Sequence, residues 1–357
     1  MEEAEGYYSS GSQKPGKILV TGASGFIGGH VARYLVDQGL EISCLVRDGS
    51  NTGFIKDLPV KLIAGDITDL NGLLTAFRGQ DAIIHTAAKV GDWGSYDAFY
   101  EANVAGTLNV LKAASENSVG RVIITGSCSS YGEENYPGLK SEESPFHSHY
   151  QYFLAGLFPS GMNHYRDTKA LMTREAIDFA DKRGLDLIIL EPVWVYGENE
   201  FNTGFYEYVK TVKSGIGFMP GSRKNTFHVI YAGDLAMAFH LALNCGLKGV
   251  HRLIAGNPSP EKMVSIHRLF CKEAGLKAPA LLPKWFVYPI GFILEFIHTI
   301  FRSKNPPILT RGRVNMFYDS IGYDTAKALK MIHFGSRLSL EDGIKRTVKW
   351  YRDNNYL

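Results

Sequence analysis

Short apolar runs alternate with amphipathic stretches along the first half of the chain. The runs have the length and composition of buried strands, and they predict strands at 17–21, 41–46, 60–64, 81–85, 121–126 and 186–190. Between the runs, apolar residues recur on one face of a helical pattern, as in Val31, Leu35 and Val36, which indicates helices. The alternation of strands and helices predicts an α/β fold built on a doubly wound parallel sheet.

The first strand leads into a glycine-rich turn, and a helical pattern follows it. In the turn Gly22-Ala23-Ser24-Gly25-Phe26-Ile27-Gly28, Gly22 permits a tight bend and Gly25 lets the backbone approach a pyrophosphate. Gly28 allows the helix to pack closely on the strand, and the amino end of the helix favours phosphate. This order predicts a Rossmann-type dinucleotide site. Its candidate residues are Gly22, Ser24, Gly25, Phe26, Ile27 and Gly28.

The end of the second strand selects between the two nicotinamide dinucleotides. An acidic residue there would hydrogen-bond the ribose of NAD, but the corresponding residue is Val46. Arg47 follows, and a guanidinium at this place favours the 2′-phosphate of NADP(H). NADP(H) is therefore the favoured cofactor. NAD(H) is the alternative if Asp48 turns inward and Arg47 is a solvated loop charge.

Two later strand ends supply further cofactor candidates. Asp66 and Ile67 follow the third strand, where a turn would meet the adenine ring. Ala87 and Ala88 follow the fourth strand, and their small side chains let the backbone pass close to the cofactor. Asn103 lies in a helical segment, where we expect its amide to hold a neighbouring strand rather than the water of a proton relay.

A tyrosine precedes a lysine by four residues at 136–140, 165–169, 206–210 and 323–327. Pro137 and Gly138 interrupt the first pair, and the last two pairs lie beyond the sixth strand. Tyr165 and Lys169 enter a helical pattern over 167–180, so both side chains share one face. The lysine ammonium is then expected to lower the pKa of the tyrosine toward the range of a general acid or base.

A serine-rich stretch ends the fifth strand, at the sheet edge where such sites gather. Ser127 can hydrogen-bond a carbonyl oxygen as hydride arrives, and Ser129 is the second choice. Ser130 is better explained by a turn that satisfies its own backbone. The catalytic candidates are therefore Ser127, Tyr165 and Lys169.

Taken together, these pieces resemble an extended short-chain dehydrogenase/reductase of the NAD-dependent epimerase/dehydratase superfamily. The matching segments are TGASGFIG at 21–28, GDITD at 65–69, HTAA at 85–88, NVAGT at 103–107, the serine stretch at 125–132, YRDTK at 165–169 and EPVWVYG at 191–197. The resemblance implies that Tyr165 and Lys169 act in catalysis together with Ser127 and also contact the cofactor. It further implies cofactor contacts at Pro192 and Val195, a smaller substrate lobe and a homodimer. One departure is the long interval 133–163, which is expected to form a substrate-side loop.

Some features favour the 3β-hydroxysteroid dehydrogenase-like and dihydroflavonol reductase-like branch over sugar-nucleotide enzymes. The segment 88–107 is similar to that branch, including bacterial reductases of long-chain 2-alkyl-3-oxo acids, and Trp93 within it is expected to line an apolar pocket. Sugar-nucleotide members usually carry an arginine where this chain has Phe227, and Glu191 also stands where an arginine is common. The missing cations disfavour a diphosphate substrate. The substrate candidates are Trp93, Ser129 and Phe227.

Residues 285–301, WFVYPIGFILEFIHTIF, form a strongly apolar segment. Pro289, Gly291 and Glu295 interrupt it, so it is too short and irregular for a transmembrane helix. The basic residues around it are Lys284, Arg302, Lys304, Arg311 and Arg313. Two interpretations stay open, namely a helix that covers the substrate lobe and a peripheral contact with an anionic membrane surface.

Composition gives no support for nucleic-acid binding, metal binding or secretion. The net charge of +2 gives no electrostatic reason to expect a nucleic-acid partner. The four scattered cysteines indicate reduced thiols, and His147 and His149 indicate a polar loop, so no metal site is expected. Residues 1–16 are acidic and then rich in serine and glycine, which predicts a disordered tail, no signal peptide and a cytoplasmic protein, with membrane association as the alternative.

We expect a Rossmann domain over 17–191 plus 227–248, and a smaller, discontinuous C-terminal substrate lobe over 192–226 plus 249–357. The sequence predicts an NADP(H)-preferring oxidoreductase that interconverts a secondary alcohol and a ketone on an apolar, steroid-, lipid- or 3-oxoacyl-like substrate. One alternative is a sugar-nucleotide epimerase or dehydratase with tightly bound NAD. A second alternative is a non-catalytic, NADP-binding regulatory protein, which an intact Ser127, Tyr165 and Lys169 set disfavours.

Overall fold

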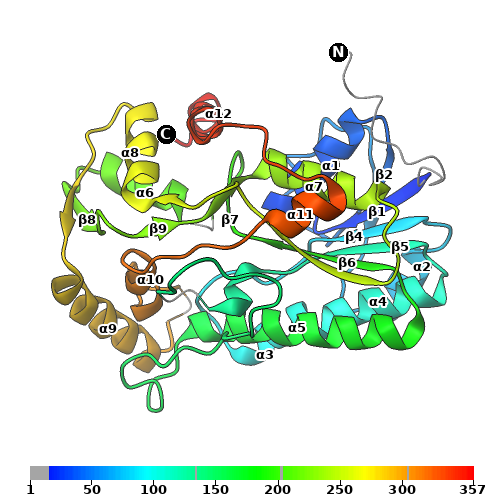
Figure 1. The fold of residues 1–357 in the computed structure, drawn as a ribbon, viewed down its shortest axis with the longest axis horizontal. Coiled ribbons are helices and arrows are strands. Elements are labelled where there is room, and N and C mark those ends of the chain that lie inside the picture. Colours follow the sequence, from blue (N-terminus) through cyan, green and yellow to red (C-terminus); the bar gives the residue numbers. More distant parts are fainter. Residues whose placement is uncertain (1–15, 133–134, 202–203, 304) are drawn as a thin grey trace.

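Seven parallel strands form one twisted sheet at the centre of the protein (Figure 1). The computed structural model describes residues 16–132, 135–201, 204–303 and 305–357, so the tail predicted at 1–16 lies outside the described residues except for Gly16. The strand order is β11-β6-β5-β4-β1-β2-β3. The strands are β1 (Lys17–Thr21), β2 (Glu41–Val46), β3 (Lys61–Ala64), β4 (Ala82–His85), β5 (Arg121–Thr125), β6 (Leu187–Pro192) and β11 (Val250–Ala255).

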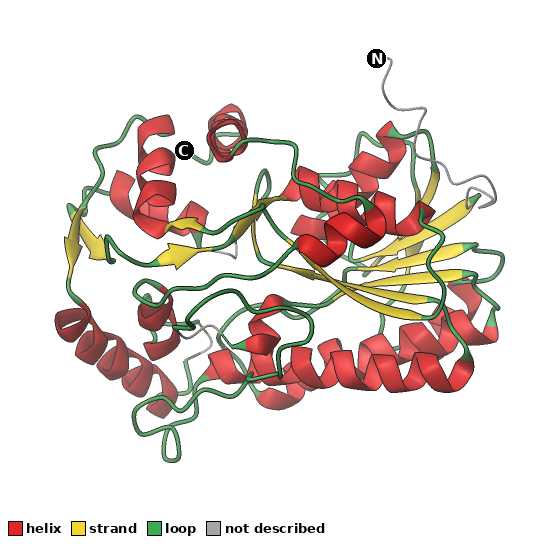
Figure 2. Ribbon diagram, viewed as in Figure 1, coloured by secondary structure: helices red, strands yellow, loops and turns green. Residues whose placement is uncertain are grey.

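Helices cover both faces of this sheet (Figure 2). One layer contains α1 (Phe26–Asp37), α7 (Ala232–Asn244) and α11 (Ala326–Ile332), and the other contains α2 (Leu70–Ala76), α4 (Gly106–Glu116) and α5 (Gly161–Arg183). Within β1, Ile18 and Val20 enter one core and Leu19 enters the other. Because both faces of the central strands are buried, those strands are continuous apolar runs in the sequence. The predicted α/β, Rossmann-type, doubly wound fold is confirmed.

The strand order reverses at β1, which pairs with β2 on one side and with β4 on the other. In doubly wound folds, dinucleotides bind at such a reversal of strand order, beyond the carboxyl ends of the strands, which here are those of β1 and β4. Thr21 ends β1 and lies opposite His85, which ends β4. The glycine-rich turn and the segment 86–88 therefore meet at this switch point.

The remaining elements gather to the left of the sheet in Figure 1. Their short strands pair as β7 with β10, β8 with β13 and β9 with β12. The elements are β7 (Trp194–Tyr196), α6 (Phe205–Lys213), β8 (Phe218–Pro220), β9 (Thr226–Phe227), β10 (Val229–Tyr231), β12 (Glu261–Lys262), α8 (Met263–Glu273), β13 (Ala280–Leu282), α9 (Lys284–Ile300), α10 (Arg311–Met316) and α12 (Leu340–Asp353).

The predicted domain boundaries need one correction. The boundary at 249 assigns residues 250–255 to the substrate lobe, but these residues form β11, the edge strand of the main sheet, paired in parallel with β6. The strand escapes recognition because it is at the edge, where His251 and Arg252 stay partly exposed and break the apolar run. The other boundaries stay predictions.

Thiol and metal-ligating side chains are scattered through the fold. All four cysteines are described, and each is a free thiol. Within the described ranges, no three His, Cys, Asp or Glu side chains are grouped so as to hold a metal ion. Across the same residues, every helix is too short or too polar to cross a bilayer.

Candidate active site

The catalytic candidates meet where β5 ends. Ser127 has an extended backbone and leads into a 3-10 turn, Cys128–Tyr131. Its Oγ lies 2.7 Å from the Oγ of Ser129 and accepts a hydrogen bond from the Ser129 N–H at 3.3 Å. Ser127 is 8% exposed and Ser129 is 6% exposed, so both hydroxyls are held in a nearly closed site.

The long helix α5 brings Tyr165 and Lys169 to the same place. It begins at Gly161, earlier than the predicted 167, and the two side chains lie one turn apart on it. The Tyr165 hydroxyl donates to Ser127 Oγ at 3.4 Å, a long contact of the kind that tightens when substrate binds. The Lys169 Nζ donates to the Thr125 carbonyl at 2.8 Å. The structure thus brings the three candidates together, and their catalytic roles stay predictions.

Lys169 carries its ammonium group in an almost closed environment. The residue is 4% exposed, and burial lowers its pKa to about 8. Burial also lowers the pKa of His85 to about 3, and the charge of Lys169 adds to that effect. A cation held in so little water acts strongly on a neighbouring phenol. The expectation that Lys169 lowers the pKa of Tyr165 stays a prediction.

A π-helical turn, Glu101–Ala105, places Asn103 beside α5. Its Oδ1 accepts from the Lys89 N–H at 2.8 Å, and its Nδ2 donates to the Lys89 carbonyl at 3.1 Å and to Thr168 Oγ1 at 3.2 Å. Asn103 thereby joins the segment after β4 to the helix that carries Tyr165. The amide has a structural role, as expected, but it holds the segment after β4 and helix α5 rather than a strand. It does so in a local helix distortion of a kind that is common at functional sites.

The glycine-rich turn has the shape that a pyrophosphate needs. Gly22 has φ +76°, in the left-handed region, and a Cβ on it would lie 2.5 Å from the Ala87 nitrogen. A Cβ on Gly28 would lie 2.3 Å from the Gly22 carbonyl oxygen, so only glycine allows α1 to pack so closely. Gly25 is the N-cap of α1, and no side chain caps that end. The N–H groups in the first turn of α1 therefore remain available to phosphate, and these residues fit a dinucleotide.

The other cofactor candidates lie after the carboxyl ends of neighbouring strands. Arg47 and Asp48 follow β2 and are both exposed. The Asp66 carboxylate accepts from the N–H and the hydroxyl of Thr68, both at 2.9 Å, so it closes its own turn. Ile67 beside it is partly buried.

Closer to the strands, the candidates are more enclosed. Ser24, Phe26, Ile27, Ala87 and Ala88 are partly buried around the switch point. Pro192 ends β6, and Val195 lies within β7 with 5% exposure.

The three substrate candidates lie in different surroundings. Ser129 contacts Ser127 directly. The Trp93 indole N–H donates to the Ser303 carbonyl at 2.8 Å, which ties Trp93 to the end of α9. Phe227 is 1% exposed, and its ring packs on Trp194 at 5.3 Å between centroids. Substrate contact by Trp93 and Phe227 stays a prediction.

The other Tyr–Lys pairs take part in packing. Lys140 Nζ donates to the two carbonyls that close the serine turn, each at 2.7 Å, and lies over the Tyr136 ring. Lys210 lies over the ring of Tyr206 on α6, and Lys327 pairs with a glutamate at 3.4 Å. The spacing alone therefore does not define a catalytic pair.

A buried ionic cluster supports the serine turn, and no sequence pattern revealed it. Glu191 is 0% exposed and accepts hydrogen bonds from Arg252 Nε at 3.2 Å and from the Tyr131 hydroxyl. Arg252 also donates to the Glu142 carbonyl at 3.1 Å. Desolvation raises the pKa of Glu191, and the charge of Arg252 opposes that effect. The partners lie far apart in sequence, so only the fold brings them together.

A glycine-rich turn at the switch point of a doubly wound sheet, with serine, tyrosine and lysine gathered at a nearby strand end, defines a Rossmann-type enzyme that uses a nicotinamide dinucleotide. The sequence model of the NAD-dependent epimerase/dehydratase family matches residues 18–255, and the chain belongs to that family. It is an NAD(P)-dependent enzyme of the extended short-chain dehydrogenase/reductase type, as the motifs predicted.

Known proteins are similar over nearly the whole chain. The 2-alkyl-3-oxoalkanoate reductase of Stenotrophomonas maltophilia (strain K279a) is 27% identical, and the match covers 92% of this chain and 98% of that protein. A putative UDP-glucose 4-epimerase of Methanocaldococcus jannaschii is also 27% identical, over 95% of this chain and 99% of that protein. The crystal structure of gox2253 superposes with a TM-score of 0.78 at 26% identity, over 96% and 99% of the two chains.

Proposed function

We propose that this protein is an NADP(H)-preferring oxidoreductase that interconverts a ketone and a secondary alcohol on an apolar, steroid-, lipid- or 3-oxoacyl-like substrate. The observation that carries the proposal is the convergence of Ser127, Tyr165 and Lys169 at the end of β5, two strands from the glycine-rich turn. A complete set of these groups disfavours a purely regulatory, non-catalytic role.

Each of the three side chains has a distinct task in this proposal. The nicotinamide cofactor, when bound, supplies or accepts the hydride. Ser127 holds the substrate oxygen by a hydrogen bond at the place where the Tyr165 hydroxyl now points. Tyr165 donates a proton to that oxygen during reduction and takes it back during oxidation. Lys169 favours the phenolate by its charge and binds the cofactor ribose, in a site whose low water content strengthens both effects.

The preference for NADP(H) rests on Arg47. Its guanidinium is exposed at the end of β2, and no hydrogen bond or ion pair engages it among the described residues. It is therefore available to a 2′-phosphate, and Asp66, the nearest acidic residue of the next strand end, is turned toward Thr68 instead. NAD(H) stays the alternative.

Two residues support an apolar substrate. Phe227 and Glu191 stand at positions where sugar-nucleotide enzymes usually carry an arginine. Phe227 belongs to the apolar core, and Glu191 is committed to Arg252. Neither can clamp a diphosphate. The relative from Stenotrophomonas maltophilia is named for 2-alkyl-3-oxoalkanoates, whose ketone sits on an alkyl chain, and this supports a substrate of the same chemical class.

The second candidate function is a sugar-nucleotide epimerase that keeps NAD tightly bound. The equally similar relative from Methanocaldococcus jannaschii favours it. The same serine, tyrosine and lysine would serve that reaction, but the cofactor would show no net turnover. A homodimer is expected for either function.

Cofactor binding tests this proposal directly. We expect NADPH to raise the melting temperature of the purified protein clearly more than NADH, and UDP-glucose to have no effect. Arg47→Ala should weaken NADPH binding by about tenfold or more, because a charge-assisted contact is lost, and should leave NADH binding nearly unchanged. Arg78→Ala, at an exposed position after α2, is the matched control. Stabilisation by UDP-glucose, or NAD that copurifies, would assign the protein to the epimerases.

A further inference from the structure

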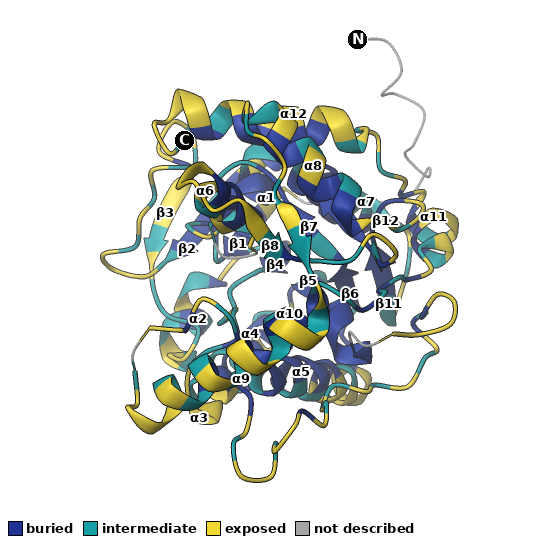
Figure 3. Cartoon of the chain, turned by 90° about the vertical axis from the view of Figure 1, so that its left-hand side faces the viewer, coloured by how far each residue is buried: buried dark blue, intermediate teal, exposed yellow. Residues whose placement is uncertain are grey.

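A broad apolar surface covers the outer side of α9 and the loop 153–158 beside it. In Figure 3 the outward side of α9 is largely exposed. Along this helix, exposed side chains recur three and four residues apart, so they share one face. The apolar face consists of Trp285, Phe286, Ile290, Ile293, Ile297, Ile300 and Phe301 from α9 and its end, Phe153, Leu154 and Leu157 from the loop, and Ile308 from the segment before α10.

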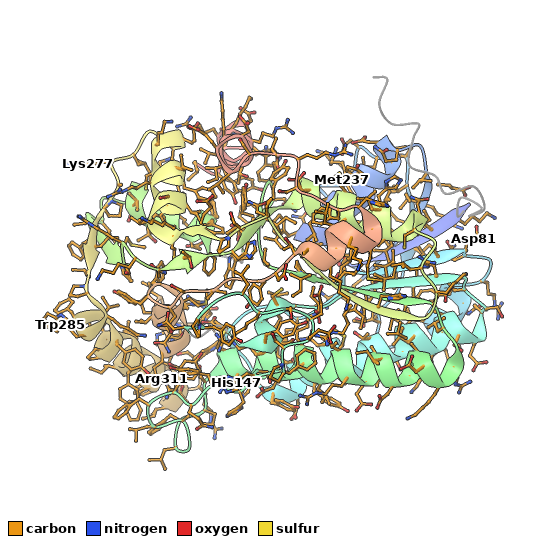
Figure 4. All side chains as sticks on the ribbon, viewed as in Figure 1. Asp81, His147, Met237, Lys277, Trp285 and Arg311 are labelled. Atoms are coloured by element: carbon orange, nitrogen blue, oxygen red, sulfur yellow. The ribbon has the colours of Figure 1, made fainter. Side chains whose placement is uncertain are left out.

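The inner side of α9 is fixed to the protein by a buried ion pair. Glu295, the sole charge between Trp285 and Phe301 in the sequence, is 3% exposed and pairs with Arg311 Nε at 2.9 Å. Arg311 is 1% exposed and also donates to the carbonyls of Phe153 and Phe158. Figure 4 shows Trp285 at the outer edge of α9 and Arg311 toward the interior. One arginine thus joins the helix to the loop, and the charges of Arg311 and Glu295 are both buried on the side away from the apolar face.

The same contacts correct the expected basic border of this segment. Arg311 is buried, and Arg313 binds both carboxylate oxygens of Asp92 at 2.7 Å. Lys284 pairs with Asp319 at 3.1 Å, whereas Arg302 is exposed next to Phe301. Three of the five predicted cations are therefore not available to anionic lipid, and Lys304 lies outside the described residues. Attraction must come chiefly from the apolar side chains.

We propose that the apolar face docks on a lipid surface, with α9 lying along the plane of the interface. Its outermost side chains project individually: Trp285, Phe301 and Ile308 are 76%, 77% and 81% exposed. They come from both ends of the helix and from the following segment. A lipid surface can contact all of them without a matching hollow, whereas a protein partner would need a pocket for each. Aromatic residues at both ends, with Lys284 and Arg302 beyond them, are typical of helices at a membrane interface.

The surface lies next to the candidate active site along the chain. The loop 153–158 runs directly into α5 at Gly161, one turn before Tyr165. Trp93, which precedes the π-helical turn, is bonded to Ser303 at the other end of α9. Docking through this face would hold the start of α5 and the segment that carries Trp93 near lipid, where an apolar substrate dissolves. This last step rests on the proposed function, but the docking itself does not.

Vesicle co-sedimentation tests the proposal with the full chain. We expect the protein to sediment with phosphatidylcholine vesicles. The triple variant Trp285→Ser, Ile293→Ser and Phe301→Ser should bind at least about tenfold more weakly, because each exposed side chain loses apolar area that the lipid would cover. Leu329→Ser, which changes a 57% exposed leucine on α11, is the matched control and should bind as the original protein does. Circular dichroism and the melting temperature should be unchanged in both variants.

The effect of lipid charge provides a second readout. Replacing about one fifth of the lipid by phosphatidylserine should change the affinity less than about tenfold, because Arg302 is the main exposed cation at this face among the described residues. Failure of the original protein to bind either vesicle overturns the proposal, as does unchanged binding by the triple variant. A dimer that the triple variant converts to monomer, without vesicle binding, would assign the face to a second copy of the chain. None of these readouts depends on cofactor or ketone chemistry.

Discussion

At the scale of single residues, the proposed chemistry depends on one hydroxyl. Tyr165→Phe keeps the ring and removes the proton that the substrate oxygen needs. We expect the turnover number to fall about a hundredfold or more, with NADPH affinity nearly unchanged. Tyr136→Phe is the matched control, because Tyr136 also precedes a lysine by four residues but is 48% exposed away from Ser127. Near-normal turnover by Tyr165→Phe would remove Tyr165 from the mechanism.

A buried histidine predicts how stability depends on pH. His267 stacks on Tyr208 with 4.0 Å between ring centroids, and burial lowers its pKa to about 3. In the unfolded chain its pKa is about 6.5, so below that pH the unfolded state takes up a proton that the folded state refuses. The contribution of neutral His267 to the free energy of unfolding is therefore complete above pH 6.5, and it is lost progressively as the pH falls toward 3.

Replacing His267 by phenylalanine isolates this contribution. Between pH 7 and pH 5, His267 should lower the free energy of unfolding of the original protein by about 2 kcal/mol. The free energy of unfolding of His267→Phe should therefore fall by about 2 kcal/mol less over the same pH range. Urea unfolding at the two pH values measures the difference. His251→Phe, at a partly exposed position of β11, should behave like the original protein. Identical pH dependence in His267→Phe would show that His267 does not titrate in this way.

At the scale of elements, α9 should depend on its buried ion pair. Arg311→Met leaves the Glu295 carboxylate buried without its cation, and we expect a loss of about 3–5 kcal/mol in the free energy of unfolding. The double variant Arg311→Met with Glu295→Leu should recover a large part of the lost free energy of unfolding, because the buried carboxylate is then also removed. Lys272→Met, which breaks an exposed pair with Glu341, should scarcely change the urea midpoint. Equal stability of Arg311→Met and the original protein would contradict this view of α9.

The elements also show what the sequence could predict. The six expected strands are present within two residues at each end. The central strands are buried over most of their length and are therefore apolar. The edge strand β3 is largely exposed, but residues 62–64 still form a recognisable apolar run. Tyr165, Lys169 and Ser127 could be brought together in advance because strand ends and helix periodicity fix their positions. The edge strand β11 could not be recognised, because its exposed residues interrupt the pattern.

Long-range pairing is the other part that the sequence did not reveal. Arg311 and Arg313 were expected at a basic border, but their partners come from Glu295 across a loop and from Asp92, more than two hundred residues earlier. The Glu191–Arg252 pair beneath the serine turn is hidden in the same way. From the local sequence alone, a charged residue is expected on the surface, because most charged side chains are exposed. Only the fold shows which charged side chains are buried against a distant partner.

At the scale of the whole molecule, the sheet and the smaller set of elements have separate tasks. The sheet edge holds the glycine-rich turn and the catalytic candidates, and it lies within residues 18–255, which the family model matches. The region with α9 supplies the apolar face, and under the proposed function it selects the substrate that reaches Tyr165. A change of substrate class within the family would therefore be expected in this second region, whereas the chemistry stays at the sheet edge.

The most direct test of the central claim is the balance of cofactor and substrate during turnover. We predict that the protein consumes NADPH in the presence of an apolar ketone such as a 2-alkyl-3-oxo acid, and forms an equal amount of the secondary alcohol. Deuterium placed at the transferring position of NADPH should appear on the carbinol carbon. Interconversion of UDP-sugars, with bound NAD and no net consumption of NADPH, would contradict the claim.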